Sequence, residues 1–288
     1  MGDEAAWVTS SCTDLGLVVL SRGTRIHERP WSQVVVHDVR ADNGIERLWF
    51  KANGIGTRHE PKPLCALSSL VADLWPEVLA VDTQRAWSLT RDAAPTWCSV
   101  LAAGDQWSLW EHLFQRYAVA QLALAAHRTR LLAIGVPERS PSTLPDQAAE
   151  LIVELALLGP ECKGLPVARQ EALAARLPAY GQWCRDLDSA GIPDTWQHDD
   201  LHSSNICVAQ SAPDNTSEQA AARHRTTTAA RSRIIDWADA STGHPFGTML
   251  ATLRSIARHG RCEVDDPGCG VCEMPSWSRS RHTHPVLS

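Results

Sequence analysis

One short segment, residues 198–208, constrains the fold of this chain more than any other part of its 288 residues. It begins His-Asp-Asp-Leu-His-Ser-Ser-Asn and continues into the apolar run Ile-Cys-Val. The first part satisfies the spacing H-x-D-L-x-x-x-N, which places Asp200 and Asn205 on one short stretch of chain. The apolar run predicts a short strand. We therefore expect a polar loop that leads directly into a β-strand.

A second aspartate follows after a polar interval. Residues 209–232 are rich in Ala, Ser, Thr, Asn and Arg without apolar periodicity, so we interpret them as a disordered insert. The next residues are Ile-Ile-Asp-Trp at 234–237, in which two β-branched residues precede Asp236. A strand at 233–237 is expected to present this carboxylate at its end.

These residue types suit phosphoryl transfer. That reaction depends on positioning and charge neutralisation more than on covalent chemistry. One carboxylate must lie beside the acceptor hydroxyl to orient it and accept its proton. Mg²⁺ near the phosphates requires hard oxygen ligands, which Asp and Asn side chains supply. The loop and the second strand together predict a site with both functions.

The segment resembles the catalytic loop of the protein-kinase-like fold, in the family of aminoglycoside phosphotransferases and choline-kinase-like enzymes. That family typically has H-G-D-L-H-x-x-N, an apolar strand, I-D-W and then G-x-P. This chain matches at 198–208 and 235–245, including Gly243 and Pro245. The resemblance implies an α+β, two-lobed fold with a small β-rich N-lobe and a larger helical C-lobe.

The resemblance also implies roles for individual residues. Asp200 is expected as the catalytic base and His198 as the residue that orients the loop. Asn205 and Asp236 are expected to bind Mg²⁺, with ATP as the phosphoryl donor. His202 occupies the place that protein kinases give to a lysine, which favours a small-molecule hydroxyl acceptor over a protein.

The N-terminal half carries the expected nucleotide site. Two strands, 33–39 and 47–52, flank a turn with the sequence Ala-Asp-Asn-Gly. Lys51 on the second strand resembles the phosphate-binding lysine of the family, and Glu60 at the start of a helix over 60–74 is its candidate partner, with Glu77 as a second choice. Strands at 77–81 and 86–90 lead into a hinge at 89–92 that is expected to meet the adenine.

The rest of the sequence predicts the lobe boundaries and the helices of the C-lobe. We expect an N-terminal segment over 1–30, an N-lobe over 31–93, a C-lobe over 94–258 and an atypical tail over 259–288. Apolar periodicity in the C-lobe predicts three helices, and their ranges are 107–134, 145–158 and 166–187.

The chain departs from the family pattern in several places. Gly44 is the only glycine in the hairpin before Lys51. Gly247 and Thr248 stand where the family usually has an aspartate that holds the loop backbone, so we expect a less firmly held loop. His244 replaces another common aspartate.

The tail is the last departure. Helices that normally close the acceptor pocket are expected after residue 258, but the sequence there is rich in Cys, Trp, Arg and Ser without periodicity. We hypothesise a truncated C-lobe whose tail arises from a frameshift or a misassigned gene end. The tail could alternatively hold zinc, although its His-x-His pair is not a usual ligand spacing, and the candidate ligands are Cys262, Cys269, Cys272, His282 and His284.

Composition narrows the expected partners and compartment. The formal net charge of −6 gives no reason to expect nucleic acid. The N-terminus begins with acidic residues and the apolar run 15–20 is too short to span a bilayer, so we expect a cytoplasmic protein without a membrane partner. Six of the nine cysteines are widely scattered, as reduced thiols are in cytosolic proteins. The sequence leaves the oligomeric state open.

Two functions fit these observations. The first is an ATP- and Mg²⁺-dependent phosphotransferase that transfers the γ-phosphate to a hydroxyl of a small molecule. The second is a catalytically inactive, nucleotide-binding remnant of the same family, which the truncated end and the replaced aspartate favour.

Overall fold

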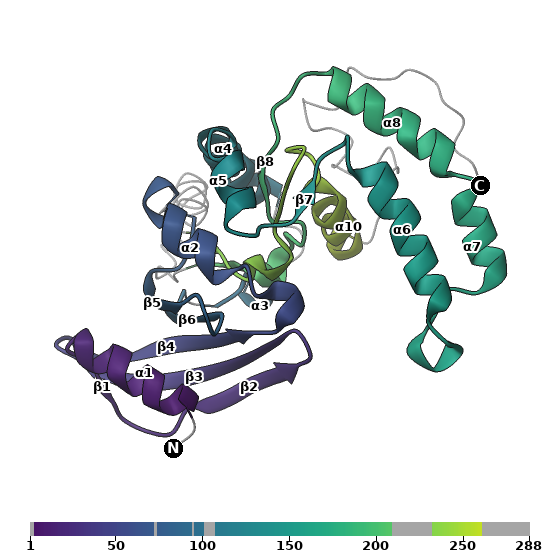
Figure 1. The fold of residues 1–288 in the computed structure, drawn as a ribbon. Helices are drawn as coiled ribbons and strands as arrows, with labels where there is room; N and C mark the ends of the chain where they lie inside the picture. Colours follow the sequence, from purple (N-terminus) through teal and green to yellow (C-terminus); the bar gives the residue numbers. More distant parts are fainter. Residues whose placement is uncertain (1–2, 72–73, 94, 101–106, 209–231, 261–288) are drawn as a thin grey trace. The chain divides into compact units, whose positions relative to one another are not determined.

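The computed structural model describes residues 3–71, 74–93, 95–100, 107–208 and 232–260 (Figure 1). The chain forms two compact units. The first contains residues 1–120, 198–239 and 248–288, and the second contains 121–197 and 240–247. All residues predicted for the active site belong to the first unit. The lobe boundaries expected at 30, 93 and 258 stay predictions.

A six-stranded sheet dominates the first unit (Figure 1). Its order is β1-β3-β4-β6-β5, and β2 pairs with β3 beside β1. All these pairings are antiparallel. The predicted pair of strands before and after the Asn-Gly turn is present, and β1 and β2 of the N-terminal segment extend the same sheet. The strands are β1 (Val18–Val19), β2 (Thr24–Arg29), β3 (Ser32–Ala41), β4 (Gly44–Asn53), β5 (Val78–Asp82) and β6 (Trp87–Arg91).

The turn between β3 and β4 differs in detail from the expected one. Ala41 pairs with Gly44, so Asp42 and Asn43 form a two-residue connection. A type I′ turn would require positive φ at both. Among the turn residues only Gly44 has positive φ, at 128°. The glycine therefore supplies the unusual backbone angle on the strand side of the turn.

Helix α1 (Asp3–Asp14) covers one face of this sheet (Figure 1). Val8 and Cys12 on the helix pack with Val39, Leu48 and Phe50 of the strands. The side chains of β3 that pack against this core are separated by even numbers of residues, because successive side chains of a strand point to opposite faces of the sheet. The other face of β4 is left to carry Lys51.

The predicted helix at 60–74 is shorter than expected. Helix α2 spans Pro61–Leu67, and short 3₁₀ turns precede it at Ile55–Thr57 and follow it at Ser68–Leu70. Pro61 and Pro63 lie in the first turn of α2, where a missing N–H costs little. Glu60 therefore stands immediately before the helix.

The rest of the first unit supports the catalytic loop. It includes α3 (Trp97–Val100), most of α4 (Trp107–Ala125) and α10 (Met249–Gly260). Strands β9 (Ile206–Cys207) and β10 (Arg233–Ile234) pair antiparallel, so the loop strand and the strand before Asp236 are neighbours. The predicted insert lies outside the described residues, apart from Ser232.

The second unit is mainly helical. It contains α5 (Arg128–Ala133), α6 (Leu144–Leu157), α7 (Val167–Ala174), α8 (Leu177–Ser189) and a 3₁₀ turn at Pro160–Cys162. A three-stranded sheet joins β7 (Glu138–Arg139), β11 (Ser241–Gly243) and β8 (Thr195–Gln197) in that order.

Two predicted helices are each divided into two. The pattern over 107–134 becomes α4 and α5, separated at residues 126–127. The pattern over 166–187 becomes α7 and α8. Pro178 explains the second break, because it has no N–H to donate to the carbonyl of residue 174, so the helical hydrogen-bond pattern is interrupted there. Pro178 is instead accommodated in the first turn of α8.

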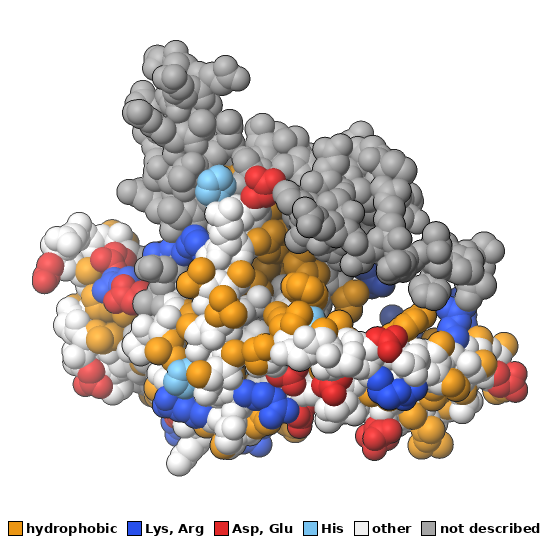
Figure 2. All heavy atoms as spheres, turned by 90° about the horizontal axis from the view of Figure 1, so that it is seen from above, with side chains coloured by type: hydrophobic (Ala, Val, Ile, Leu, Met, Phe, Trp, Pro, Cys, Tyr) orange, Lys and Arg blue, Asp and Glu red, His pale blue; other side chains and the backbone are white. Residues whose placement is uncertain are grey.

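The described surface carries charges of both signs. On the face shown in Figure 2, acidic and basic side chains stand beside one another rather than in separate fields. Among the described residues, no helix combines the length and apolar character that a membrane crossing requires. The six cysteines in the described ranges are free thiols, as expected. The tail with its candidate zinc ligands lies outside these ranges.

Candidate active site

The loop that carries the predicted motif runs from His198 to a 3₁₀ turn at Ser203–Asn205, which leads into β9. Asp199 has a φ of 62°, in the left-handed region. The family pattern has glycine at this position, and aspartate is one of the few other residues that tolerate the conformation. The departure from glycine is therefore compatible with the same bend.

His198 holds two segments of the site together. The side chain is fully buried, and its Nε2 lies 2.8 Å from the carbonyl oxygen of Ile235. The backbone N–H of Asp200 donates to its Nδ1 at 3.3 Å. Nδ1 is therefore the acceptor and Nε2 the donor, which is the neutral form of the ring. Burial lowers the pKa of His198 to about 4, in agreement with a neutral ring.

Asp200 and Asn205 are in contact within the loop. Nδ2 of Asn205 donates to the carbonyl oxygen of Asp200 at 3.0 Å and lies 3.5 Å from its carboxylate Oδ2. The amide nitrogen thus faces Asp200, and Oδ1 of Asn205 is the atom that a cation would contact. The loop therefore holds the predicted base and one predicted metal ligand side by side.

His202 contacts the same carboxylate oxygen of Asp200 as Asn205 does, and its Nε2 lies 3.3 Å from Asn205 Nδ2. Its Nε2 is 3.4 Å from Asp200 Oδ2, and its Nδ1 accepts a hydrogen bond from the Ser204 N–H. The hydrogen bond with Asp200 raises the pKa of His202, although partial burial opposes this effect. The imidazole is thus placed to interact with the carboxylate predicted to receive the acceptor's proton.

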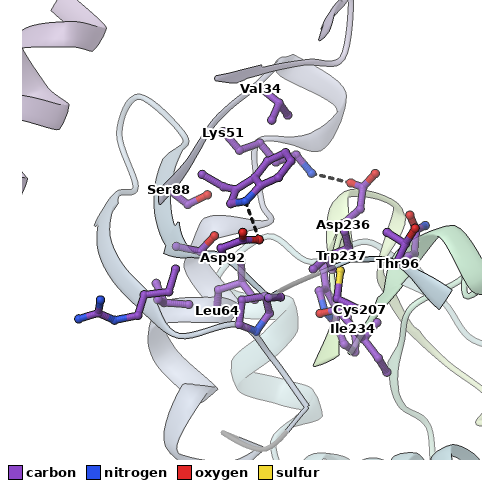
Figure 3. A pocket seen from close by; sticks show the side chains of 18 of the residues that line it. Val34, Lys51, Leu64, Ser88, Asp92, Thr96, Cys207, Ile234, Asp236 and Trp237 are labelled. Atoms are coloured by element: carbon purple, nitrogen blue, oxygen red, sulfur yellow. Dashed lines mark hydrogen bonds and ion pairs between the residues drawn. The ribbon is translucent and has the colours of Figure 1, made fainter. Parts of the chain in front are cut away.

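Lys51 joins the sheet to the second aspartate. Its Nζ lies 2.7 Å from Glu60 Oε2 and 2.5 Å from Asp236 Oδ1. The Lys51 side chain is 15% exposed and that of Glu60 is 3% exposed, whereas that of Asp236 is 51% exposed. One carboxylate of the cluster is therefore buried beneath the lysine and the other faces open space. Figure 3 shows the pairing of Lys51 with Asp236.

The one ammonium and two carboxylates of this cluster shift one another's pKa values. Burial by itself lowers the pKa of Lys51, but the adjacent carboxylates raise it above its ordinary value. Burial raises the pKa of Glu60 despite the opposing effect of Lys51. Burial also acts to raise the pKa of Asp236, but Lys51 outweighs it and the net shift is downward. The cluster therefore keeps a charged ammonium beside an ionised, accessible Asp236.

The backbone around Asp236 is fixed from several directions. Asp236 has a φ of 60°, an uncommon angle for a residue other than glycine. The N–H of Ile235 donates to the Asn205 carbonyl at 2.9 Å, and the N–H of Trp237 donates to Glu60 Oε1 at 2.8 Å. These bonds hold both neighbours of Asp236 and so maintain the bend that directs its carboxylate.

A cavity of about 400 Å³ brings four of the predicted residues together: Lys51, Glu60, Asn205 and Asp236. Its volume is within the usual range for small-ligand sites. Ser88, Thr96, Cys207 and Ile234, each from a different segment, also line it (Figure 3). Asp200 and His198 are not among the lining residues, and they reach the cavity through their bonds to Asn205 and Ile235.

The predicted hinge also borders this cavity. Thr90, Arg91 and Asp92 are lining residues, and the chain beyond them is tied to β9 by a Val208 N–H to Pro95 carbonyl bond of 3.0 Å. Trp49 was not predicted for the site. Its Nε1 donates to Asp92 Oδ1 at 3.1 Å. Its position two residues before Lys51 on the same strand face was the signal that could have identified it.

The loop backbone is held by hydroxyl groups where an aspartate was expected. The His198 N–H lies 3.3 Å from Thr248 Oγ1, and Thr252 Oγ1 donates to the Leu201 carbonyl at 2.8 Å. Both threonines are buried. The replacement of the aspartate therefore does not leave the loop without side-chain support.

No protein-family model and no curated protein matches the sequence. Solved structures of small-molecule phosphotransferases match the fold. Macrolide 2'-phosphotransferase MphH from Brachybacterium faecium has a TM-score of 0.51 at 16% identity, over 88% of this chain and 80% of that protein. A macrolide 2'-phosphotransferase type I gives 0.49 at 13% identity, over 91% and 80%. Choline kinase LicA from Streptococcus pneumoniae gives 0.48 at 16% identity, over 88% and 79%.

At these identities the likeness establishes the fold, and the match with MphH carries that conclusion. The predicted α+β, protein-kinase-like fold is confirmed. The fold alone does not assign an activity or an acceptor. Those depend on the Lys51 cluster and the loop.

Proposed function

We propose that this chain is an ATP- and Mg²⁺-dependent phosphotransferase that transfers the γ-phosphate to a hydroxyl of a small molecule. The observation that carries the proposal is the convergence of Lys51, Glu60, Asp236 and Asn205 on one cavity, with Asp200 bonded to Asn205. The cluster offers a cation for phosphate oxygens, oxygen ligands for a metal and a carboxylate for a hydroxyl. The cytoplasmic location belongs to the same proposal.

The donor set fits Mg²⁺. Asp236 supplies an ionised and half-exposed carboxylate, and Asn205 supplies a carboxamide oxygen. Mg²⁺ is commonly held by one or two protein oxygens, with water and substrate phosphates completing its shell. In the described part of the chain, no group of three or more His, Cys, Asp or Glu forms a different metal site. When bound, the ion would neutralise negative charge on the phosphates.

Lys51 has the properties of a phosphate-binding residue. Glu60 is almost fully buried and fixes the ammonium from below, while Asp236 holds it from the open side. The raised pKa keeps the ammonium charged at neutral pH. Because the partner Asp236 is exposed, Lys51 can exchange part of this pairing for phosphate oxygens.

Asp200 supplies the general base in the proposal. Its carboxylate oxygen lies 3.5 Å from Asn205 Nδ2, and its backbone is held through His198. A carboxylate at this position can accept a hydrogen bond from the acceptor hydroxyl and then its proton. His202 beside it stands where protein kinases have a lysine, which favours a small-molecule acceptor over a protein.

The experiment that tests the proposal measures nucleotide binding and turnover separately. The full chain is titrated with Mg-ATP by calorimetry, and phosphate transfer is followed with macrolides, aminoglycosides, amino alcohols and sugars. We expect binding and ADP formation that increases with one acceptor class. Binding without transfer would favour the nucleotide-binding remnant, and the absence of binding would refute both.

A further inference from the structure

We infer that Tyr117, Thr248 and Thr252 form a hydroxyl clamp that positions the catalytic loop. The inference deepens the proposed phosphotransferase function and rests on it for its kinetic consequence. None of the three residues lines the cavity. Tyr117 lies on α4, Thr248 immediately precedes α10, and Thr252 lies in the first turn of α10. Their role is to place Asp200, without contact with substrate.

The first half of the clamp holds the beginning of the loop. The His198 N–H lies 3.0 Å from Tyr117 Oη and 3.3 Å from Thr248 Oγ1. The two hydroxyl oxygens are 3.0 Å apart, within hydrogen-bond distance of each other. Each hydroxyl has two acceptor sites, so both can face the same N–H while one donates to the other. The loop thus begins from an amide that two helices fix.

The second half of the clamp holds the residue after Asp200. Thr252 Oγ1 donates to the Leu201 carbonyl at 2.8 Å and lies 3.0 Å from the Thr248 carbonyl oxygen. Thr248 and Thr252 are one helical turn apart and therefore face the same direction. One helix end consequently holds the backbone on both sides of the Asp199–Asp200 pair.

The clamp lies in a water-excluded setting. Thr248, Thr252, His198 and Leu201 are at most 1% exposed, and Tyr117 is 4% exposed. Buried backbone groups that lose a partner cannot be compensated by solvent. A missing hydroxyl is therefore expected to shift the loop until its backbone groups find other partners.

A displacement of the loop would affect both Asp200 and the backbone next to Asp236. His198 bonds to the Asp200 N–H and to the Ile235 carbonyl, next to Asp236. A shift of the His198 backbone therefore moves the proposed base relative to the proposed metal ligand. Phosphoryl transfer depends steeply on such positions, whereas nucleotide affinity depends mainly on Lys51 and the cavity wall.

The test compares Thr248→Val, which removes the hydroxyl but keeps the shape, with Thr248→Ser, which keeps the hydroxyl. Thr242→Val is the matched control, because Thr242 is equally buried and its hydroxyl bonds a backbone carbonyl, that of Pro137, in the β7-β11-β8 sheet. Backbone hydrogen exchange over residues 198–205, kcat and the KM for Mg-ATP are measured for each full-length variant.

In Thr248→Val we expect loop exchange to accelerate about tenfold. We expect kcat to fall about tenfold to a hundredfold with KM changed less than about threefold. Thr248→Ser should retain wild-type values, and Thr242→Val should leave loop exchange unchanged. Tyr117→Phe should act in the same direction, and its effect should not multiply with that of Thr248→Val because both serve one N–H.

The clamp is refuted if Thr248→Val matches Thr242→Val in loop exchange, or if Thr248→Ser is as damaging as Thr248→Val. Where Thr248→Val does not fold, Tyr117→Phe and Thr252→Val provide the same comparison. If the wild-type chain transfers no phosphate, the proposed function fails, and hydrogen exchange alone still decides whether the clamp exists.

Discussion

The Lys51 cluster and the start of the catalytic loop differ in how they are held: ion pairs hold the first, whereas hydrogen bonds of buried neutral groups hold the second. Lys51, Glu60 and Asp236 form ion pairs of 2.5 and 2.7 Å. Around His198 the contacts are hydrogen bonds between a neutral imidazole, hydroxyls and backbone amides. The two regions meet at Ile235, whose N–H donates to the Asn205 carbonyl and whose own carbonyl oxygen lies 2.8 Å from His198 Nε2.

The difference follows from what each region is expected to do. A cation that must receive phosphate oxygens needs partners that it can exchange, and an accessible ion pair provides them at small cost. A base that must stay in one position needs directional bonds, and buried neutral hydrogen bonds provide these without an uncompensated charge. The following predictions, ordered by expected effect, examine this contrast.

The largest effect is expected for the base. Asp200→Asn keeps the shape and the backbone bonds of the loop but removes the proton acceptor. We expect kcat to fall by about three orders of magnitude, while the affinity for Mg-ATP changes little. Steady-state kinetics and calorimetry measure the two quantities. Unchanged turnover would end the assignment of Asp200 as base.

The second prediction concerns the pH dependence of the neutral region. Unfolded His198 takes up a proton below its ordinary pKa of 6.5, whereas in the folded chain the pKa is about 4. Between these values the unfolded state binds more protons. The free energy of unfolding should therefore fall as pH decreases through this window, by up to about 3 kcal/mol, and this contribution should level off below pH 4.

The measurement is urea unfolding at several pH values for the wild type and His198→Gln. The buried His37 and His244, whose pKa values burial also lowers, contribute equally to both chains. The difference between the two curves isolates His198. Parallel curves would show that the ring is not the source of the pH dependence.

The third prediction tests the charged region. Glu60→Gln keeps an oxygen for the Trp237 N–H but removes the buried charge beneath Lys51. Lys51 retains Asp236, so the free energy of unfolding should fall by about 2 kcal/mol, less than for a fully unpaired charge. Glu77→Gln is the control, because Glu77 is 63% exposed and pairs with Arg91 on the surface, where such pairs contribute little. Equal losses of unfolding free energy in the two variants would contradict a stabilising contribution from the buried Lys51–Glu60 pair.

The smallest effect is expected at the hinge. Asp92 accepts a bond from the indole of Trp49, but its side chain is exposed. Asp92→Asn preserves an acceptor, so we expect the free energy of Mg-ATP binding to change by no more than about 0.5 kcal/mol. Calorimetric titration of the variant measures it. A much larger loss of binding free energy would mean that the Asp92 carboxylate contributes to Mg-ATP binding together with the Lys51 cluster.

Local sequence pattern predicted the parts of the site that lie close together in the chain. The spacing of His198, Asp200 and Asn205 fits one loop, and the apolar run after the Asn-Gly turn identified the strand that carries Lys51. The family resemblance predicted Glu60, at the start of an expected helix, as the partner of Lys51, and the structure brings the two into contact. The functional roles of these residues remain predictions.

Pattern alone could not provide contacts between distant segments. Tyr117 and Thr248 are 131 residues apart, and a buried threonine at a helix start has the same appearance whether it caps its own helix or supports a loop. The break before Pro178 was missed because apolar periodicity continues across it. Strand β2 was missed because most of its residues are exposed, which leaves no apolar alternation to detect.

The positive φ of Asp236 limits which substitutions can probe this position. Alanine would remove the carboxylate and also impose a side chain that disfavours the left-handed backbone, so two causes would be mixed in one measurement. Asparagine tolerates that backbone and changes only the ligand's charge, while glycine relaxes the backbone and deletes the ligand. Comparison of these two variants separates the chemistry of the side chain from the geometry of the bend.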